Sequence, residues 1–213
     1  MISLGPDNIE RTISTVGWVL SRIRCGNEPM RWFICFGYLL GHIRDGGFVR
    51  DKDGNIKQGE DIDIGVLYEE LNDGLAANNI INGFGKFGYN VDHKITNNID
   101  GKIFYINFKN PKLPDICLFA WYKHNNIRYH TYDFNREKKD IPTEYVFKGI
   151  PAFALEKVVK HYIKEANKEV HFPLMYGTCL DVWYPNWKIK REGESETPYL
   201  VKMKSCKEFE TIK

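Results

Sequence analysis

Two aspartates, Asp61 and Asp63, lie one residue apart in the run Glu-Asp-Ile-Asp-Ile-Gly-Val that begins at Glu60. In an extended strand, residues two apart project from the same face, so both carboxylates would point one way and Ile62 and Ile64 the other. Two carboxylates on one face repel each other where water is scarce, which favours a divalent cation between them. The pair therefore predicts a metal site, with Mg²⁺ (or Mn²⁺) as the expected ion.

A glycine-opened helix precedes this pair in the sequence Gly37-Tyr-Leu-Leu-Gly-His-Ile-Arg-Asp-Gly-Gly-Phe48. Glycine lets a phosphate approach the backbone, and the N–H groups at a helix start point toward an anion. Gly37 and Tyr38 are therefore candidate phosphate contacts. Arg44, near the far end of the helix, is a candidate for pairing with a phosphate in bidentate fashion. An ordinary surface cation favoured by the helix dipole is the alternative for Arg44.

A third carboxylate, Asp115, follows Pro114 and leads into the apolar run Ile-Cys-Leu-Phe. If this run is a strand beside the acidic one, Asp115 would complete the metal site and accept the proton of an attacking hydroxyl. A turn residue after Pro114 is the alternative interpretation.

Composition limits the classes of function. The chain has 213 residues, 43% hydrophobic and 14% aromatic, which predicts a compact domain. A net charge of +2 gives no overall attraction to nucleic acid or to an anionic membrane, so no nucleic-acid partner is expected. The N-terminus lacks the features of a signal peptide, and no apolar run is long enough to be a transmembrane segment. We therefore expect a soluble, cytoplasmic protein.

The five cysteines are an odd number without CxxC spacing. Cys35 and Cys117 lie inside apolar, strand-like runs, and we expect the five cysteines to be reduced core or surface thiols in preference to a metal or redox role.

Hydrophobic periodicity and turn residues predict the elements that position these groups. Helices are expected at Asp7–Arg24, Tyr38–Arg44, Tyr68–Phe84 and Ala152–Glu169. Strands are expected at Arg31–Phe36, Glu60–Leu67, Tyr89–Ile95, Lys102–Phe108, Asp115–Tyr122 and Ile127–Tyr132, the last four as a meander. The step Asp53-Gly54 predicts a tight turn in the polar segment before the acidic strand.

The two N-terminal motifs together resemble the signature of the LicD/fukutin family, which runs close to Gly-Thr-Leu-Leu-Gly-x-x-Arg-x-x-Gly-Phe and then Asp-Asp-Asp-Ile-Asp-Ile. Pro114–Phe119 resembles a later strand of that family, and Met175–Pro185 resembles its C-terminal Tyr-Gly, Trp and Pro element. The resemblance spans roughly Arg31 to Trp187. It implies an α+β, nucleotidyltransferase-like mixed β-sheet flanked by helices, in a single domain over 1–213 with a helical, aromatic C-terminal portion from about residue 151.

The resemblance also implies an activity. Family members move a phospho-alcohol, such as phosphocholine or an alditol phosphate, from a CDP-linked donor such as CDP-choline to a sugar hydroxyl of a glycan or glycan precursor. By this resemblance Asp61, Asp63 and Asp115 are the catalytic and metal-binding residues, and Gly37, Tyr38 and Arg44 bind the donor.

Two alternatives remain open at the level of the sequence. One is a nucleotidyltransferase that moves a nucleoside monophosphate onto a small molecule or protein. The other is an inactive member that binds a nucleotide or a partner. The second gains support from two departures: Tyr38 replaces a small hydroxyl residue, and an insertion at Asp51–Gly59 lengthens the link between the motifs.

Overall fold

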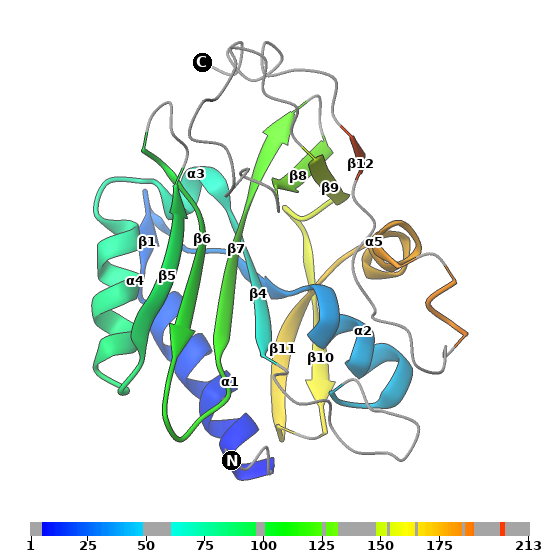
Figure 1. Ribbon diagram of the computed structural model, residues 1–213, viewed down its shortest axis with the longest axis horizontal. Helices are drawn as coiled ribbons and strands as arrows, with labels where there is room; N and C mark the ends of the chain where they lie inside the picture. Colours follow the sequence, from blue (N-terminus) through cyan, green and yellow to red (C-terminus); the bar gives the residue numbers. More distant parts are fainter. Residues whose placement is uncertain are drawn as a thin grey trace.

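A mixed β-sheet with helices on both faces forms the molecule (Figure 1). The computed structural model describes residues 6–48, 61–96, 101–124, 127–131, 148–152, 154–164, 166–184, 186–189 and 201–202. This arrangement confirms the predicted α+β class. The turn expected at Asp53–Gly54 and the insertion at Asp51–Gly59 lie outside the described residues.

Eight strands make up the main sheet: β3 (Trp32–Ile34), β4 (Ile62–Leu67), β5 (Asn90–Thr96), β6 (Ile103–Lys109), β7 (Ile116–His124), β8 (Ile127–Thr131), β9 (Lys148–Ala152) and β12 (Val201–Lys202). The path β12-β9-β8-β7-β4-β3 carries a branch in which β7 also pairs with β6, and β6 with β5. The first part of β7 pairs parallel with β4 and antiparallel with β6, and its last residues pair with β8. The acidic strand therefore lies between β3 and β7 in the middle of the sheet.

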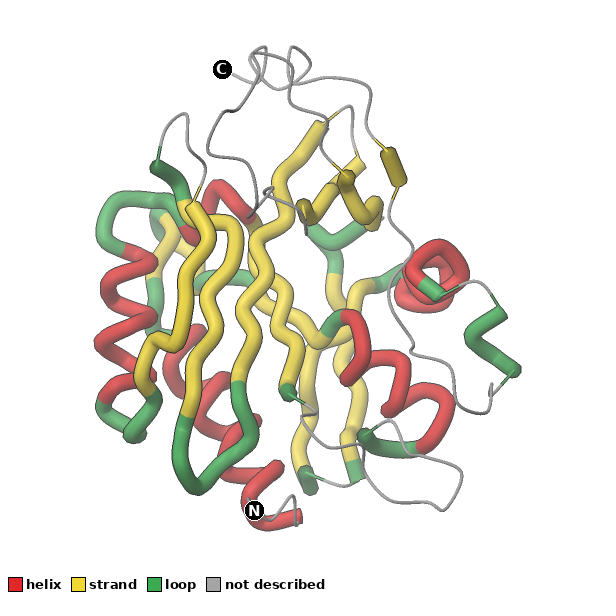
Figure 2. The backbone as a smooth tube through the Cα atoms, in the orientation of Figure 1, coloured by secondary structure: helices red, strands yellow, loops and turns green. Residues whose placement is uncertain are grey.

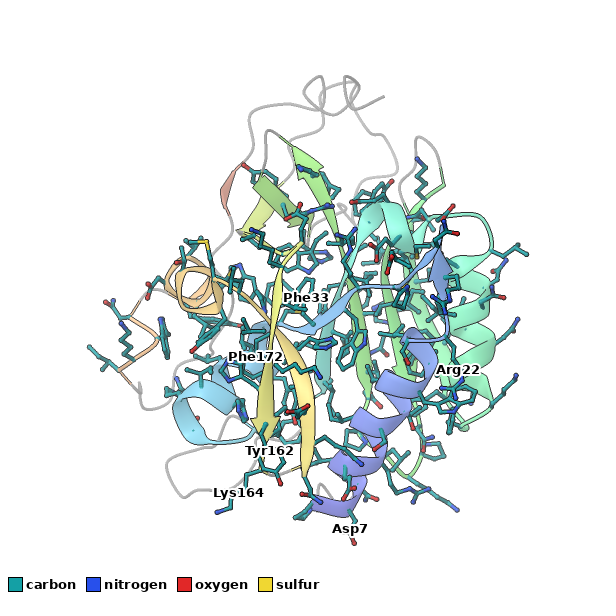
Figure 3. All side chains as sticks on the ribbon, turned by 180° about the vertical axis from the view of Figure 1, so that it is seen from behind. Asp7, Arg22, Phe33, Tyr162, Lys164 and Phe172 are labelled. Atoms are coloured by element: carbon teal, nitrogen blue, oxygen red, sulfur yellow. The ribbon has the colours of Figure 1, made fainter. Side chains whose placement is uncertain are left out.

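The described residues form five helices beside these strands: α1 (Pro6–Leu20), α2 (Phe36–Asp45), α3 (Tyr68–Leu71), α4 (Ala76–Gly85) and α5 (Tyr176–Trp183). Helix α1 confirms the predicted opening helix, with Ile9, Ile13 and Val16 of its apolar stripe buried. Figure 3 shows α1 crossing the back of the sheet. Within the described ranges, no helix is long and apolar enough to cross a membrane.

Helix α2 confirms the predicted helix between the glycine motif and its Gly-Gly end. Gly46 adopts the left-handed conformation with φ +76°, and its N–H donates to the carbonyl of His42. Gly47 N–H then donates to the carbonyl of Gly41. Glycine accepts this conformation without a side-chain penalty, so the pair ends the helix.

The single helix expected over Tyr68–Phe84 is instead two helices, α3 and α4. The prediction was therefore wrong for residues 72–75, which separate them. Asn72 follows α3, and its side chain accepts from Ile103 N–H at 2.8 Å and donates to Ile103 C=O at 3.0 Å. Gly74 then takes φ +50°. An asparagine side chain that bonds to a neighbouring strand competes with helix continuation, and glycine provides the turn.

The four strands expected as a meander are β5 to β8, and consecutive members pair antiparallel as predicted. Most of the observed strand ends differ from the expected ends by one residue.

The helix expected over Ala152–Glu169 is wrong. The segment contains the end of β9 and then a hairpin of β10 (Val158–Ile163) with β11 (Lys168–Pro173), which turns at Asn167 with φ +49°. The apolar residues fit a helical stripe, yet the segment is rich in β-branched and aromatic residues that favour a half-buried strand. In the described part of the C-terminal portion expected to be helical from about residue 151, the helix is α5.

The hairpin packs its apolar side chains inward. Figure 3 shows Phe172 against the body of the molecule, while Tyr162 and Lys164 lie at the rim of the hairpin. Phe172 is fully buried and Tyr162 is 58% exposed. A second short hairpin, β1 (Arg24–Cys25) with β2 (Glu28–Pro29), connects α1 to β3.

Helices lie on both faces of the sheet (Figure 2). On the face of Ile62 and Ile64, α4 packs its Phe84 ring 4.6 Å from Phe108. On the face of Asp63, α5 stacks Trp183 on Trp121 at 5.4 Å. In the pairing of β4 with β7, Asp63 lies opposite Cys117 and Ile62 opposite Ile116, so the aspartate and the isoleucines project to opposite faces, as predicted.

We predict that Gly65→Ala destabilises the protein by about 1–3 kcal/mol, because a Cβ at Gly65 would overlap the buried ring of Phe33. Gly85→Ala is the matched control, since its Cβ would meet nothing within 4 Å; it should be neutral or slightly stabilising. Urea unfolding of both variants measures the difference. Equal stability of the two would contradict the packing of β3 on β4.

Candidate metal centre

Asp63 links the acidic strand to the start of α2. Its Oδ2 accepts from the N–H of Gly37 at 2.9 Å and from the N–H of Tyr38 at 3.3 Å. Its backbone carbonyl accepts from Cys35 N–H at 3.0 Å. Cys35 precedes α2, and its side chain does not cap the helix. The Asp63 carboxylate on β4 accepts from N–H groups of the first turn in its place.

The backbone at Phe36, where the chain passes from β3 into α2, takes a rare conformation that lets the first turn of α2 reach Asp63. Phe36 has φ +43°, a region that non-glycine residues rarely enter. Its buried ring lies 4.8 Å from Phe119, 5.2 Å from Trp121 and 4.9 Å from Trp183, which holds the residue in place. A Cβ at Gly37 would lie 3.3 Å from Asp63 Oδ2. Glycine at this position therefore leaves room for the carboxylate.

Asp61, Asp63 and Cys117 form a cluster in which one potential ligand atom from each residue lies within 4.8 Å of the others. Asp63 and Cys117 are register partners across the parallel pair β4–β7, so their side chains share a face. The Cys117 thiol donates to Asp61 Oδ2 at 2.6 Å. The predicted proximity of Asp61 to Asp63 is confirmed, and Cys117 joins them.

Two neighbours from β6 surround the Cys117 sulfur. Tyr105 Oη lies 2.9 Å from Sγ, and Asn107 Nδ2 donates to Sγ at 3.2 Å. Because the thiol proton is directed at Asp61, the tyrosine hydroxyl is the donor in its contact.

Burial governs the electrostatics of the cluster. It raises the pKa of the Asp61 carboxyl, an effect that the hydrogen bond from Cys117 partly offsets. Burial, followed by the nearby carboxylates of Asp61 and Asp63, raises the pKa of the Cys117 thiol well above its ordinary range. Groups that are expensive to ionise together in a buried site are those that a divalent cation stabilises.

Asp115 lies beside this cluster without being one of its three members. It immediately precedes β7, and its backbone carbonyl accepts from Ile62 N–H at 2.9 Å. Burial raises the pKa of its carboxyl, the nearby Lys109 opposes this, and the charge of Asp61 adds to it. Asp115 is thus within electrostatic range of Asp61, and its predicted roles in catalysis and in metal binding both stay predictions.

Gly37 and Tyr38, two of the residues expected to bind the CDP-linked substrate, donate their backbone N–H groups to Asp63. The Tyr38 ring is buried against Phe48, with the ring centroids 4.9 Å apart. Arg44 pairs through two nitrogens with the carboxylate of Asp45, at 3.2 and 2.9 Å. Arg44 follows Gly37 by seven residues, which separates the two residues by about 10 Å along the helix axis.

Phosphate binding by Gly37, Tyr38 and Arg44 stays a prediction.

Sequence reasoning missed Cys117, Tyr105 and Asn107. The four described cysteines are free thiols, as expected. A signal for Cys117 was nevertheless present: it follows Asp115 by two residues in a strand, so it shares the face of that carboxylate. Tyr105 and Asn107 gave no comparable signal, because only the pairing of β6 with β7 brings them to the cluster.

The residues present fit a divalent cation. Two carboxylates and one thiol converge, and carboxylate oxygen and cysteine sulfur are both metal ligands in proteins. Beside them, Asn107 is 6% exposed, and its Oδ1 has no hydrogen-bond partner among the described residues. Since buried acceptors are normally satisfied, this oxygen indicates that a polar group belongs in the site.

A family model described as LicD/FKTN/FKRP, nucleotidyltransferase domain, matches residues 29–156. This match includes the glycine motif, the acidic strand and the strand after Asp115. The chain belongs to the LicD/FKTN/FKRP family. Membership indicates a transferase of the phosphotransferase type that modifies glycans, in a family whose members generally depend on a metal ion. Met175–Pro185 lies beyond the match, so the resemblance of that segment stays a prediction. A search of curated proteins finds no match.

We predict that Asp63→Ala lowers stability by about 1–3 kcal/mol, because two N–H groups at the start of α2 lose their acceptor. Asp63→Asn should lose less than half as much, since its amide oxygen can still accept. Chemical unfolding of both variants gives the comparison, with Asp73→Ala at an exposed position as the control. If the alanine and asparagine variants were equally stable, the proposed cap would be wrong.

Proposed function

We propose that this protein is a metal-dependent phosphotransferase that moves a phospho-alcohol, such as phosphocholine or an alditol phosphate, from a CDP-linked donor to a sugar hydroxyl. The observation that carries the proposal is the convergence of Asp61 and Asp63 beneath the start of α2, within a chain of the LicD/FKTN/FKRP family. We propose Mg²⁺ or Mn²⁺ as the cation and a cytoplasmic location, within one LicD-type domain.

The two carboxylates of the acidic strand would hold the cation. A cation bound there would offset the negative charge that gathers on the phosphate oxygens during transfer. Asp63 is held in one orientation by Gly37 and Tyr38 N–H, which reduces the reorganisation required at the moment of reaction. These hydrogen bonds also bring the positive end of α2 toward the same point.

Asp115 is the residue we propose as general base. It would accept the proton of the sugar hydroxyl as that oxygen forms a bond to the phosphorus carrying the alcohol group. The bond from this phosphorus to the bridging oxygen breaks, and CMP leaves with the electron pair. The position of Asp115 at the start of β7, with its backbone hydrogen-bonded to Ile62 beside Asp61, supports the role, since a general base must lie close to the hydroxyl that it deprotonates.

Two alternative functions are separated from this proposal by nucleotide binding and by the product released. A nucleotidyltransferase would use the same carboxylates and release a different product, so the choice of donor separates it from the first proposal. An inactive, binding member would bind no donor in a metal-dependent way. Tyr38 supplies its backbone N–H to Asp63 irrespective of its side chain, so the replacement of a hydroxyl residue there does not by itself favour inactivity.

We predict that CDP-choline and CDP bind more tightly than ATP in the presence of Mg²⁺ or Mn²⁺, as measured by isothermal titration calorimetry. Asp61→Asn combined with Asp63→Asn should weaken this binding at least tenfold, about 1.4 kcal/mol or more, because the carboxylates no longer hold the cation. Asp73→Asn, an exposed residue after α3, is the matched control and should bind as the wild type does.

With an oligosaccharide acceptor, the same pair of substitutions should lower CMP release by about 10²-fold or more. Preference for ATP would support nucleotide transfer instead. Absence of metal-dependent binding to any of the nucleotides would contradict both enzymatic proposals.

A further inference from the structure

The thiol of Cys117 lies beside the two carboxylates of the acidic cluster, Asp61 and Asp63. Cys117 Sγ, Asp61 and Asp63 present ligand atoms within 4.8 Å of one another, and Cys117 is 3% exposed. The sulfur is fixed by the sheet, because Cys117 is the register partner of Asp63 on β4 and of Asn107 on β6. It is therefore directed into the cluster by the strand pairing, independently of any flexible loop.

The surroundings of the sulfur suit a metal-bound thiolate. Tyr105 Oη at 2.9 Å and Asn107 Nδ2 at 3.2 Å both donate toward Sγ. If the thiol proton leaves, these two donors remain and stabilise the negative sulfur. The contact with Asp61 Oδ2 at 2.6 Å is replaced by shared ligation of one cation. Donors arranged around a ligand atom in this way are the outer groups found at metal sites in proteins.

A second observation points to a missing polar group at the same place. The amide that donates through Nδ2 to Cys117 carries an Oδ1 with no partner in the described part of the chain. Asn107 is 6% exposed, so bulk water does not satisfy this oxygen. A hydrated cation beside the sulfur brings hydrogen-bond donors to it.

We propose that Cys117 is the third protein ligand of the cation, and that the site therefore prefers cations that accept sulfur, such as Mn²⁺, Zn²⁺ and Cd²⁺, over Mg²⁺. A purely oxygen site favours Mg²⁺, whereas a thiolate shifts the preference toward softer metals. On binding, the S–H bond breaks, its proton passes to solvent, and a sulfur–metal bond forms without any change of oxidation state. This inference rests on the metal site of the proposed function and requires no nucleotide.

Cadmium titration of the purified protein without nucleotide tests the proposal. Cd²⁺ bound to a thiolate produces an ultraviolet charge-transfer band. We expect this band to saturate at one Cd²⁺ per chain in the wild type and to be absent in Cys117→Ser. Cys25→Ser is the matched control, because Cys25 is a partly exposed thiol outside the cluster, and it should retain the band.

Two further variants separate ligation from simple structural damage. Tyr105→Phe keeps the ring that packs 5.0 Å from Phe119 and removes only the hydroxyl donor. It should retain the band while lowering Cd²⁺ affinity by about 10-fold or more. Asp61→Asn should weaken Cd²⁺ binding while leaving the thiol in place. If Cys117→Ser does not fold, ¹¹³Cd NMR of the wild type and of Cys25→Ser decides: in both proteins the bound cadmium should show the downfield shift of a sulfur ligand.

The proposal is overturned if the wild type binds Cd²⁺ without the band, if it does not bind Cd²⁺, or if folded Cys117→Ser retains the band. It is also overturned if competition shows that Mg²⁺ displaces Mn²⁺ at equal concentration. A positive result combined with no CMP release would instead leave the thiol site intact and overturn the proposed transfer reaction, so the two failures are distinguishable.

Discussion

The carboxylate of Asp63, held at the first turn of α2, is the interaction on which the arrangement of the site depends. It accepts from Gly37 and Tyr38 N–H, while the backbone carbonyl of the same residue accepts from Cys35 N–H. These bonds require the left-handed Phe36, whose ring is held among Phe119, Trp121 and Trp183. The aromatic packing of one sheet face thus stabilises the strained backbone that brings a helix start onto an acidic strand.

The sheet supplies the remaining groups by register. Parallel pairing of β4 with β7 places Cys117 opposite Asp63, and antiparallel pairing of β6 with β7 places Asn107 opposite Cys117. Side chains that are far apart in the sequence therefore occupy one polar row on a face that is otherwise aromatic. The opposite face, with Ile62 and Ile64, is also packed with apolar side chains. In this way one strand serves both stability and the candidate site, because alternate residues point to opposite faces.

Local patterns predicted the parts of the fold that local physics determines. The acidic strand, the glycine-terminated α2 and the β5–β8 meander follow from alternation and turn residues in short windows. The hairpin β10–β11 did not follow, because its apolar residues fit helical spacing as well and only pairing across Asn167 decides between the two. Likewise, Asp61 and Asp63 were recognisable from spacing and family resemblance, whereas the approach of Tyr105 and Asn107 to Cys117 depends on long-range register. The expectation that Gly37 opens space for a phosphate did not anticipate that Asp63 fills this space in the structure.

On our proposal, the carboxylates beneath α2 share one cation. Anomalous diffraction from crystals grown with Mn²⁺, recorded without nucleotide, tests it most directly. We expect one anomalous peak coordinated by Asp61, Asp63 and Cys117, with Asp63 still accepting from Gly37 N–H. A fully loaded crystal whose peak lies at other residues, or a map without a peak at this cluster, would contradict it.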